Sequence, residues 1–472
     1  MKNTVKSYLR IAGIIALTAV IGFAMAACDT DNNGSTDPDL SGDITIYPID
    51  NVYTETELTA KYDGLEAVSY HWKNGTNSVG TNSNKFTPTE PGSYTVTVSA
   101  AGYKPKSSAA VTVSERWILF NSITELSNWL STQPRNDLDS IYYVKLNAAG
   151  LGGKSSTSGS VGYALSGADQ KLVRLNLSGS TFTSVEMSAF ENCSHLVGIT
   201  LPNTVTKIDK EAFNGCSSLL NITIPNSVIS IEENAFKSCD NLSSVTLGNN
   251  IQSIDHYAFE YCKKLENITI PATVTYLSPS AFAGCSGLTE INVDSSNSKY
   301  SSQDGVLFNK DKTSLIKCPE GKTGAFSIPT SVNDIGDAAF YACSKLTSVF
   351  IPNSVGRIQN WAFAECSSLT AITISNSVYN IFDYTFYKCA GLTSITIPNN
   401  VDYIGEKAFA FCTKLTSVNF QASIEEKFFE ENAFGEKDED DYIGDLREKY
   451  LTGKEGTYTR ENSNSVTWSK QL

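Results

Sequence analysis

Cysteine is the residue type with the most regular spacing in this chain of 472 residues. Evenly spaced cysteines could form disulfides or bind zinc. Equivalent side chains of stacked repeats lie parallel at about 4.8 Å, however, whereas a disulfide needs Cβ atoms about 3.8 Å apart that turn toward each other. No CxxC pair or nearby histidine completes a zinc site. The spacing therefore predicts structural buried thiols at nine positions: Cys193, Cys216, Cys239, Cys262, Cys285, Cys343, Cys366, Cys389 and Cys412.

Catalytic chemistry has few other candidates. The three histidines, His71, His195 and His256, have no serine, aspartate or cysteine partner at a recognisable spacing. The sequence also contains no glycine-rich nucleotide-binding motif. We therefore predict a protein that is not an enzyme and that uses no metal or cofactor.

The charge of the chain limits its partners. Lysine and arginine number 36 against 50 aspartates and glutamates, which gives a formal net charge of −14. Nucleic acid is excluded as a partner because phosphate binding needs a basic surface. Nine of the acids fall within residues 422–441, which we interpret as a solvated acidic end.

The cysteines belong to a longer repeat that predicts the fold. A phenylalanine precedes each of the nine cysteines by three residues. In the unit 219–239, the apolar residues Leu219, Ile222 and Ile224 have the spacing of a leucine-rich-repeat strand, and Val228 begins the return along the convex side. One unit cannot bury these residues alone, so stacked units share a core and need caps at both ends. We predict a mainly β solenoid of ten or eleven 23-residue units, about 50 Å long.

This run of units resembles the BspA-like, Treponema-type family of bacterial leucine-rich-repeat surface proteins over about residues 171–434. The resemblance implies an exported protein that binds host or neighbouring-cell components and turns over no substrate. A longer unit contains the segment 300–319, with apolar runs at Val306–Phe308 and Leu315–Ile316 around a polar turn. It is similar to a hairpin insertion that this family carries. We interpret it as either a protruding contact or a family decoration.

The start of the chain predicts export. Basic residues precede an apolar run, Ile11–Ala27, and this is typical of a signal peptide at residues 1–27. The run ends at Met25-Ala-Ala-Cys28, which resembles the lipobox of bacterial lipoproteins with Met25 in place of the usual leucine. The resemblance implies lipid attachment at Cys28, so that the protein contacts the membrane only through this lipid. Simple secretion and a single membrane-spanning anchor are the alternatives.

Residues 43–115 alternate polar and apolar side chains between turn signals, which predicts a small β-sandwich. They resemble Ig-like or PKD-like modules, with Trp72 as the core tryptophan and Tyr94 as a candidate tyrosine corner. A capping box at Ser122 predicts a short helix in the following segment. The chain thus divides into a signal peptide (1–27), a flexible tether (28–42), the Ig/PKD-like β-sandwich (43–115), an N-terminal cap (116–170), the repeats (171–434) and a C-terminal cap (435–472).

Two surfaces of the predicted solenoid offer ligand contacts. The strand position between the two isoleucines points away from the core, onto the concave sheet, and forms an almost uncharged column: Thr200, Thr223, Thr246, Thr269, Asn292, Ser327, Phe350, Thr373, Thr396 and Asn419. Large aromatic residues gather in the late units at Trp361, Tyr384, Tyr379, Tyr387, Tyr403, Phe382 and Phe411. Such rings are typical of sugar and protein sites. The alternatives are that threonine suits a half-exposed strand and that the rings cover one another.

These observations predict a non-enzymatic protein, lipid-anchored to the bacterial cell envelope and displayed on its outer surface. We expect a monomer whose solenoid acts in adhesion or protein–protein interaction. Its ligand is then a protein or glycan on host or neighbouring cells. An envelope structural scaffold and a lectin-like carbohydrate binder are the alternative functions.

Overall fold

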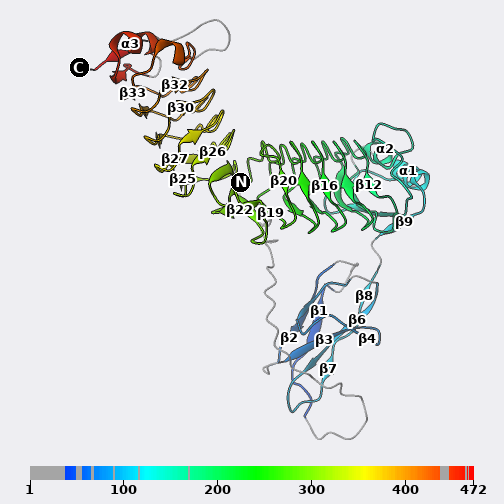
Figure 1. The fold of residues 1–472 in the computed structure, drawn as a ribbon. Coiled ribbons are helices and arrows are strands. Elements are labelled where there is room, and N and C mark those ends of the chain that lie inside the picture. Colours follow the sequence, from blue (N-terminus) through cyan, green and yellow to red (C-terminus); the bar gives the residue numbers. More distant parts are fainter. Residues whose placement is uncertain are drawn as a thin grey trace, which may run out of the picture. The chain divides into compact units, whose positions relative to one another are not determined.

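The computed structural model describes residues 38–48, 56–64, 68–88, 91–114, 117–167, 171–435, 446–462, 465 and 467–471. The chain divides into two compact units, Met1–Arg116 and Trp117–Leu472 (Figure 1). The predicted signal peptide and Cys28 lie outside the described residues. None of the described helices is long and apolar enough to cross a membrane.

The first unit contains two small antiparallel sheets that share one core. Trp72 and Tyr94 are buried in it, and the Trp72 ring of one sheet lies 5.7 Å from the Phe86 ring of the other. One sheet consists of β1 (Ile44–Tyr47), β2 (Leu58–Tyr62) and β5 (Lys85–Phe86). The other consists of β3 (Ser69–Asn74), β4 (Asn77–Val79), β6 (Gly92–Ser99), β7 (Lys106–Ser107) and β8 (Val111–Val113).

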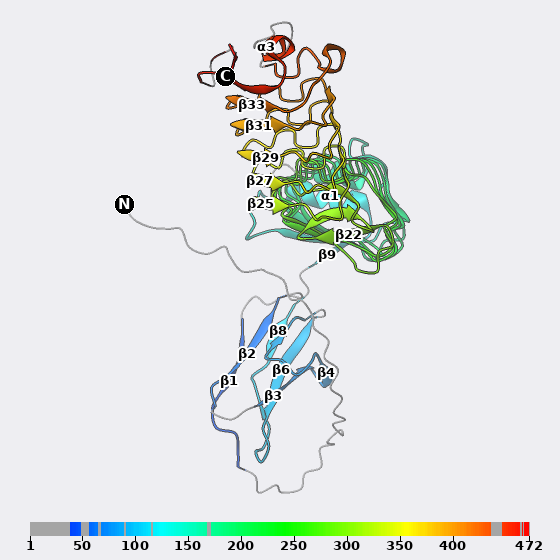
Figure 2. The same cartoon turned by 60° about the vertical axis from the view of Figure 1, so that its left-hand side comes forward.

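The second unit confirms the predicted β-solenoid. It has about 13 turns with a repeat of about 23 residues, more than the ten or eleven units expected. The difference arises because β9 and β10, in the segment predicted as a separate cap, pair in parallel with the strands that follow. One strand of each turn contributes to what we call the main ladder: β9 (Ile118–Phe120), β10 (Tyr142–Leu146), β11 (Val173–Asn176), β13 (Leu196–Thr200), β15 (Asn221–Thr223), β17 (Ser244–Thr246), β19 (Asn267–Ile270), β21 (Glu290–Val293), β25 (Gly324–Ser327), β27 (Leu346–Phe350), β29 (Ala371–Thr373), β31 (Ser394–Ile397) and β33 (Ser417–Phe420). Figure 2 shows β25 to β33 stacked in this order.

Shorter strands on another side of the turns form the short ladder. Pairing is in register, so Ile208 lies opposite Ile231, and each strand places one branched aliphatic side chain in the core. Before the insertion these strands are β12 (Ser184–Val185), β14 (Lys207–Ile208), β16 (Ser230–Ile231), β18 (Ser253–Ile254) and β20 (Tyr276–Leu277). After it they are β26 (Asp334–Ile335), β28 (Arg357–Ile358), β30 (Asn380–Ile381) and β32 (Tyr403–Ile404).

The repeated phenylalanines form the centre of the core. From Phe190 to Phe282 neighbouring rings stack with centroids 5.0 to 5.6 Å apart, and from Phe340 to Phe434 with centroids 4.7 to 5.4 Å apart. Each ring is thereby removed from water by the turns on both sides. In these turns each phenylalanine is buried by its neighbours and cannot be buried by one turn alone.

The insertion contains the predicted hairpin, but it does not protrude, so the interpretation as a protruding contact was wrong. β22 (Tyr300–Gln303) pairs with β23 (Val306–Asn309), and β24 (Ser314–Lys317) pairs with β23 and in parallel with β26. Val306, Phe308 and Leu315 are buried. Their apolar side chains face the core because β24 takes a place in the short ladder. The insertion therefore continues the core and separates an earlier set of turns from a later one.

Both ends of the solenoid are covered. At the first end, Ser122 Oγ accepts a hydrogen bond from Glu125 N at 3.2 Å and caps α1 (Ile123–Thr132), as its capping box predicts. At the other end, β34 pairs antiparallel with β33 and so ends the parallel main ladder. The remaining end elements are α2 (Val161–Ser166), η1 (Glu426–Phe428), α3 (Leu446–Gly453), β34 (Gly456–Thr459) and β35 (Ser469–Lys470).

Candidate binding surfaces

The cysteine column belongs to the interior of the solenoid. The nine regularly spaced cysteines are buried, and none of the ten cysteines in the described part of the chain forms a disulfide. In all turns except that of Cys343 the thiol lies 3.0 to 3.4 Å from a backbone carbonyl of the preceding turn, as Cys216 Sγ does from Phe190 O. Burial raises the pKa of the Cys216 thiol well above its usual range. Because the thiolate is the reactive form, such a thiol is inert. The repeat pattern in the sequence did not predict the hydrogen bond from the thiol to the carbonyl of the preceding turn.

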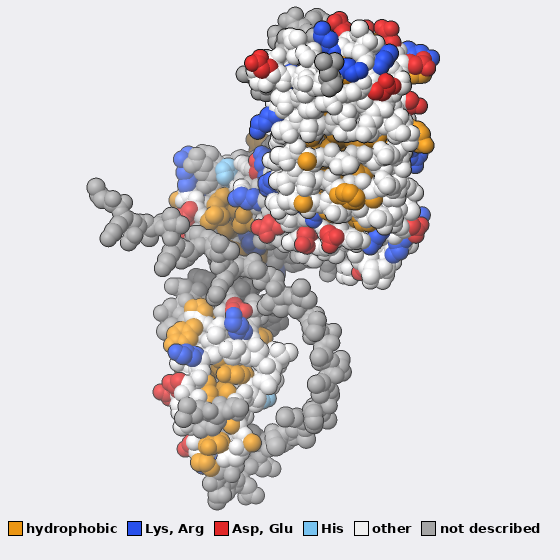
Figure 3. Space-filling view, turned by 90° about the vertical axis from the view of Figure 1, so that its left-hand side faces the viewer, with side chains coloured by type: hydrophobic (Ala, Val, Ile, Leu, Met, Phe, Trp, Pro, Cys, Tyr) orange, Lys and Arg blue, Asp and Glu red, His pale blue; other side chains and the backbone are white. Residues whose placement is uncertain are grey.

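The outward column of the main ladder, from Thr200 to Asn419, forms the surface that we call the threonine face. Its ten positions are exposed except Asn292 and Asn419, which are half-buried. Phe350 interrupts the column with a side chain that is 58% exposed. Figure 3 shows that the centre of this face, over the strands after the insertion, is largely uncharged with a small hydrophobic area. The face can therefore contact another surface without removing charges from water.

The predicted aromatic residues separate into two groups. The first, which we call the aromatic stack, contains the predicted Trp361, Tyr384, Tyr387 and Phe411 together with Tyr341, which was not predicted. The Trp361 and Tyr384 rings are stacked with centroids 4.0 Å apart and planes 5° from parallel, and Tyr387 meets both edge-on. The stack packs over small side chains outside the main core. Trp361 and Tyr384 are half-buried by it.

The second group, Phe382 and Tyr403, lines what we call the aromatic pocket. It is a cavity of about 320 Å³ bounded by Asn380, Phe382, Asp402, Tyr403 and Phe428. The Phe382 and Tyr403 rings lie 6.2 Å apart at 54°. Asn380 and Tyr403 are paired neighbours in β30 and β32, so the short ladder forms one wall.

The end cap supplies the other wall of the pocket. A β-bridge between Ile404 and Phe429 holds η1 next to β32, which brings Phe428 to the pocket with its side chain 41% exposed. Tyr379, also predicted, is 57% exposed, and its carbonyl accepts a hydrogen bond from Asp402 N at 2.9 Å. Phe428 was missed because it follows the last regular unit, where the repeat gives no signal.

Acidic groups surround Tyr403. Its hydroxyl donates to Asp383 Oδ1 at 3.4 Å. Burial raises the pKa of Tyr403, and the negative charges of Asp383 and Glu430 raise it further. The site therefore disfavours an additional negative charge.

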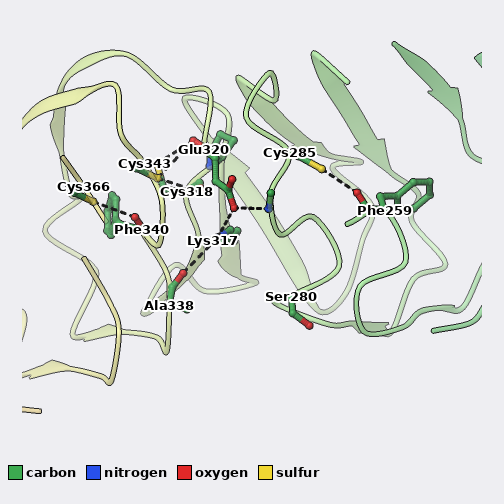
Figure 4. Close-up of polar contacts among 12 residues, drawn as sticks. Phe259, Ser280, Cys285, Lys317, Cys318, Glu320, Ala338, Phe340, Cys343 and Cys366 are labelled. Atoms are coloured by element: carbon green, nitrogen blue, oxygen red, sulfur yellow. Dashed lines mark hydrogen bonds and ion pairs between the residues drawn. The ribbon is translucent and has the colours of Figure 1, made fainter. Parts of the chain in front are cut away.

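Lys317 and Glu320 form a buried ion pair at the insertion (Figure 4). Lys317 and Glu320 are each only 4% exposed, and Lys317 Nζ lies 3.7 Å from Glu320 Oε1. Glu320 Oε1 also accepts a hydrogen bond from Gly284 N at 2.9 Å. Burial raises the pKa of the Glu320 carboxyl, and the charge of Lys317 opposes that shift.

The regular turns explain the position of this carboxylate. The amide equivalent to that of Gly284 donates to a backbone carbonyl of the next turn, as Tyr261 N does to Ala283 O at 2.9 Å. Glu320 therefore replaces a carbonyl that the insertion displaces. The pair is structural, because both of its charges are closed off from ligands.

The histidines show no relay of proton-transfer groups. Ser278 Oγ lies 2.8 Å from His256 Nδ1, and Asp255 Oδ1 lies 3.9 Å from the same ring nitrogen. A catalytic relay needs the two groups on opposite nitrogens. Among the residues that the structure describes, no group of three or more His, Cys, Asp and Glu side chains could hold a metal ion.

The fold and the repeated core define a leucine-rich-repeat solenoid protein. The family described as BspA type leucine rich repeat region matches residues 183–306 and 320–438 in six copies. These segments cover more than half of the chain, which therefore belongs to this family. The unmatched gap between them contains most of β23 and all of β24, the core strands of the insertion.

Solved structures with a similar chain come from several bacteria. A leucine rich cell surface protein of Faecalibacterium prausnitzii is 26% identical over 71% of this chain and 96% of its own, with a TM-score of 0.44. The pneumococcal vaccine antigen PcpA is 19% identical over 79% of this chain and 88% of its own, with a TM-score of 0.50, and shares the fold. A leucine rich repeat protein of Treponema pallidum is 25% identical over 42% of this chain and 78% of its own, with a TM-score of 0.26. No curated protein matches the chain.

Proposed function

We propose that the protein is a non-enzymatic binding protein of the bacterial cell surface, which acts in adhesion or protein–protein interaction through its solenoid. Its membership of the BspA type family supports the proposal. The observation that carries it is the gathering of aromatic rings outside the main core, in the turns after the insertion. Stacking of the turns needs only the inward side chains, so these outer rings are available for contacts that the core does not require.

Aromatic side chains are suited to this role. They contribute much apolar contact area at a small cost in side-chain entropy, and they dominate the binding energy of many interfaces. The threonine face adds a long, largely uncharged surface on the main ladder of the same turns. We infer that a macromolecular ligand contacts the turns from β25 to β33, with Trp361, Tyr384, Tyr379, Tyr387, Tyr403 and Phe382 as the residues that supply the aromatic contacts.

The experiment that tests this function measures binding of the purified chain, without residues 1–27 and labelled at its new N-terminus, to cultured epithelial cells and to other bacterial species. Saturable binding to at least one of them is expected, with retention of a protein or glycan partner after cross-linking. Absence of binding to every cell type, with the protein confined to the producing cell's own envelope, would favour the scaffold instead.

We also propose that the chain is exported and held at the cell surface by a lipid on Cys28. The basic start, the apolar run and the lipobox-like Met25-Ala-Ala-Cys28 support this. Replacing Cys28 by serine is expected to move the protein from the detergent phase to the aqueous phase in a Triton X-114 partition. Unchanged partition of that variant would contradict lipid attachment. Digestion by protease added to intact cells tests display on the outer surface.

A further inference from the structure

We propose that the aromatic pocket binds one arginine side chain of a basic partner protein. The inference deepens the proposed function, because it names the chemistry of the partner that one part of the surface recognises. It rests on three properties of the pocket: its aromatic walls, its size and its charge.

The walls of the pocket are aromatic on more than one side. Phe382 and Tyr403 come from neighbouring turns, and Phe428 comes from the end cap. Aromatic rings have a negative face that attracts cations, and the planar guanidinium group of arginine also stacks on them. Lys427 Nζ already lies 4.6 Å from the centroid of the Phe428 ring, so this ring accepts a cation within the chain itself.

The size of the pocket suits a single side chain. Its volume of about 320 Å³ is at the lower end of the roughly 300–1,000 Å³ that small-molecule pockets enclose. The three-carbon stem of an arginine can lie along Phe382 and Tyr403 while its charged end reaches the polar rim. A chain of several sugar rings would extend well beyond these walls.

The charge of the pocket selects a cation. Asp402 is exposed, and no lysine or arginine in the described part of the chain forms an ion pair with this carboxylate. Lys427, which lies over the Phe428 ring, is paired with Glu425 at 3.1 Å instead. With the Asn380 amide in its satisfied orientation, Asn380 donates to Asp402 Oδ1 at 3.1 Å and fixes the carboxylate at the rim. Asp383 and Glu430 add negative charge next to Tyr403. These charges attract a cation and repel an anion.

The short ladder contains an example of the proposed contact. Two turns before the pocket, Arg357 Nε lies 3.2 Å from Asp334 Oδ1 between neighbouring strands of the same ladder. Asp402 presents its carboxylate one residue before Tyr403, at the last strand of this ladder, and none of the described lysines or arginines forms an ion pair with it. A partner's arginine would supply a cation there and could form two hydrogen bonds to the carboxylate.

The probe for the test is the peptide acetyl-Gly-Arg-Gly-amide, and its neutral counterpart replaces arginine by citrulline, which has nearly the same shape. Binding to the purified chain is measured by saturation-transfer NMR. We expect the arginine peptide to bind at least tenfold more tightly than the citrulline peptide and more tightly than the corresponding lysine peptide or methyl glucoside. Asp402→Asn should weaken arginine binding at least tenfold.

Two matched variants control this test. Asp311→Asn removes the same charge from an exposed turn of the insertion, and it should change binding less than twofold. Tyr276 occupies the position of Tyr403 in an earlier turn and is 45% exposed, so Tyr276→Ala should have no effect whereas Tyr403→Ala should weaken binding at least fivefold. Asp402→Asn preserves the shape of the side chain, so its result does not depend on Tyr403→Ala remaining folded.

The inference is overturned if the citrulline peptide, the lysine peptide or methyl glucoside binds as well as the arginine peptide, or if Asp402→Asn and Asp311→Asn behave alike. The measurement uses no cells. Failure of the peptide test with intact cell binding would therefore reject the arginine site alone, and loss of cell binding with peptide binding preserved would reject the proposed function alone.

Discussion

The turns before and after the insertion have the same interior but different outer side chains. Ion pairs connect neighbouring turns in both sets, as Lys210 to Glu233 at 3.0 Å and Lys237 to Glu260 at 2.6 Å do before the insertion and Arg357 to Asp334 at 3.2 Å does after it. After it, the aromatic stack and the aromatic pocket occupy the outer surface. Stacking of the turns determines the inward-facing side chains in both sets. Only the outward-facing side chains can therefore differ between the two sets.

The two sets of turns meet at the insertion. We expect a substitution there to lower the free energy of unfolding more than any other considered below. Glu320→Ala leaves Lys317 buried without its partner and leaves Gly284 N without its acceptor. Breaking a buried ion pair costs about 3–5 kcal/mol, so we expect a loss of that size in the free energy of unfolding. Urea denaturation monitored by circular dichroism measures it.

A double variant separates charge from packing in this prediction. Lys317→Met with Glu320→Leu removes both charges and keeps similar volumes, and it should be much more stable than Glu320→Ala. If Glu320→Ala alone costs less than about 1 kcal/mol, the ion pair with Lys317 and the hydrogen bond from Gly284 N contribute little to stability, contrary to the expectation.

The aromatic stack should contribute to stability as well as to binding. Trp361→Ala with Tyr384→Ala removes two half-buried rings stacked at 4.0 Å, for an expected loss of roughly 2 kcal/mol. Tyr257 occupies the position of Trp361 and Tyr384 in an earlier turn and is 41% exposed, so Tyr257→Ala should cost less than about 0.5 kcal/mol. Equal losses for the two variants would show that the stacking adds nothing.

Alanine variants of two cysteines test whether the buried thiols contribute equally to stability before and after the insertion. Cys239→Ala removes a buried thiol that donates to Phe213 O at 3.3 Å, and about 1 kcal/mol should be lost. Cys343 follows the insertion and has only longer contacts of 3.7 Å to Cys318 O and Pro319 O. Cys343→Ala should therefore cost less than Cys239→Ala in the same denaturation experiment, and the opposite order would contradict a role for the thiol hydrogen bond.

The sequence predicted the parts that repetition determines. A phenylalanine three residues before each of the nine regularly spaced cysteines was enough to identify the solenoid, because a side chain that recurs at the repeat spacing must lie at the same depth. The hairpin of the insertion was predicted but its burial was not, because the alternation of Val306 and Phe308 is the same in a protruding hairpin and in a strand that joins the core. Glu320 takes the place of a backbone carbonyl, and backbone groups are the same at every residue. The sequence pattern therefore could not predict this role of Glu320.

The binding surfaces were predicted less completely. The repeat placed Trp361 and Tyr384 at one position of neighbouring turns, and the structure stacks them. It gave no means of separating Tyr387, which joins that stack, from Tyr403, which lines the pocket. Phe428 reaches the pocket only through the bridge between Ile404 and Phe429, a long-range contact that no local pattern encodes.

The central claim is that the turns after the insertion bind a macromolecular ligand, and cell binding of two double variants tests it most directly. The chain without residues 1–27 is compared with Trp361→Ala/Tyr384→Ala and with Tyr257→Ala/Tyr276→Ala, at a temperature where circular dichroism shows all three folded. We expect at least tenfold weaker binding for the first variant, since buried aromatic residues at an interface centre contribute about 2 kcal/mol or more, and unchanged binding for the second. Undiminished binding by the folded first variant, or equal loss in both, would contradict the claim.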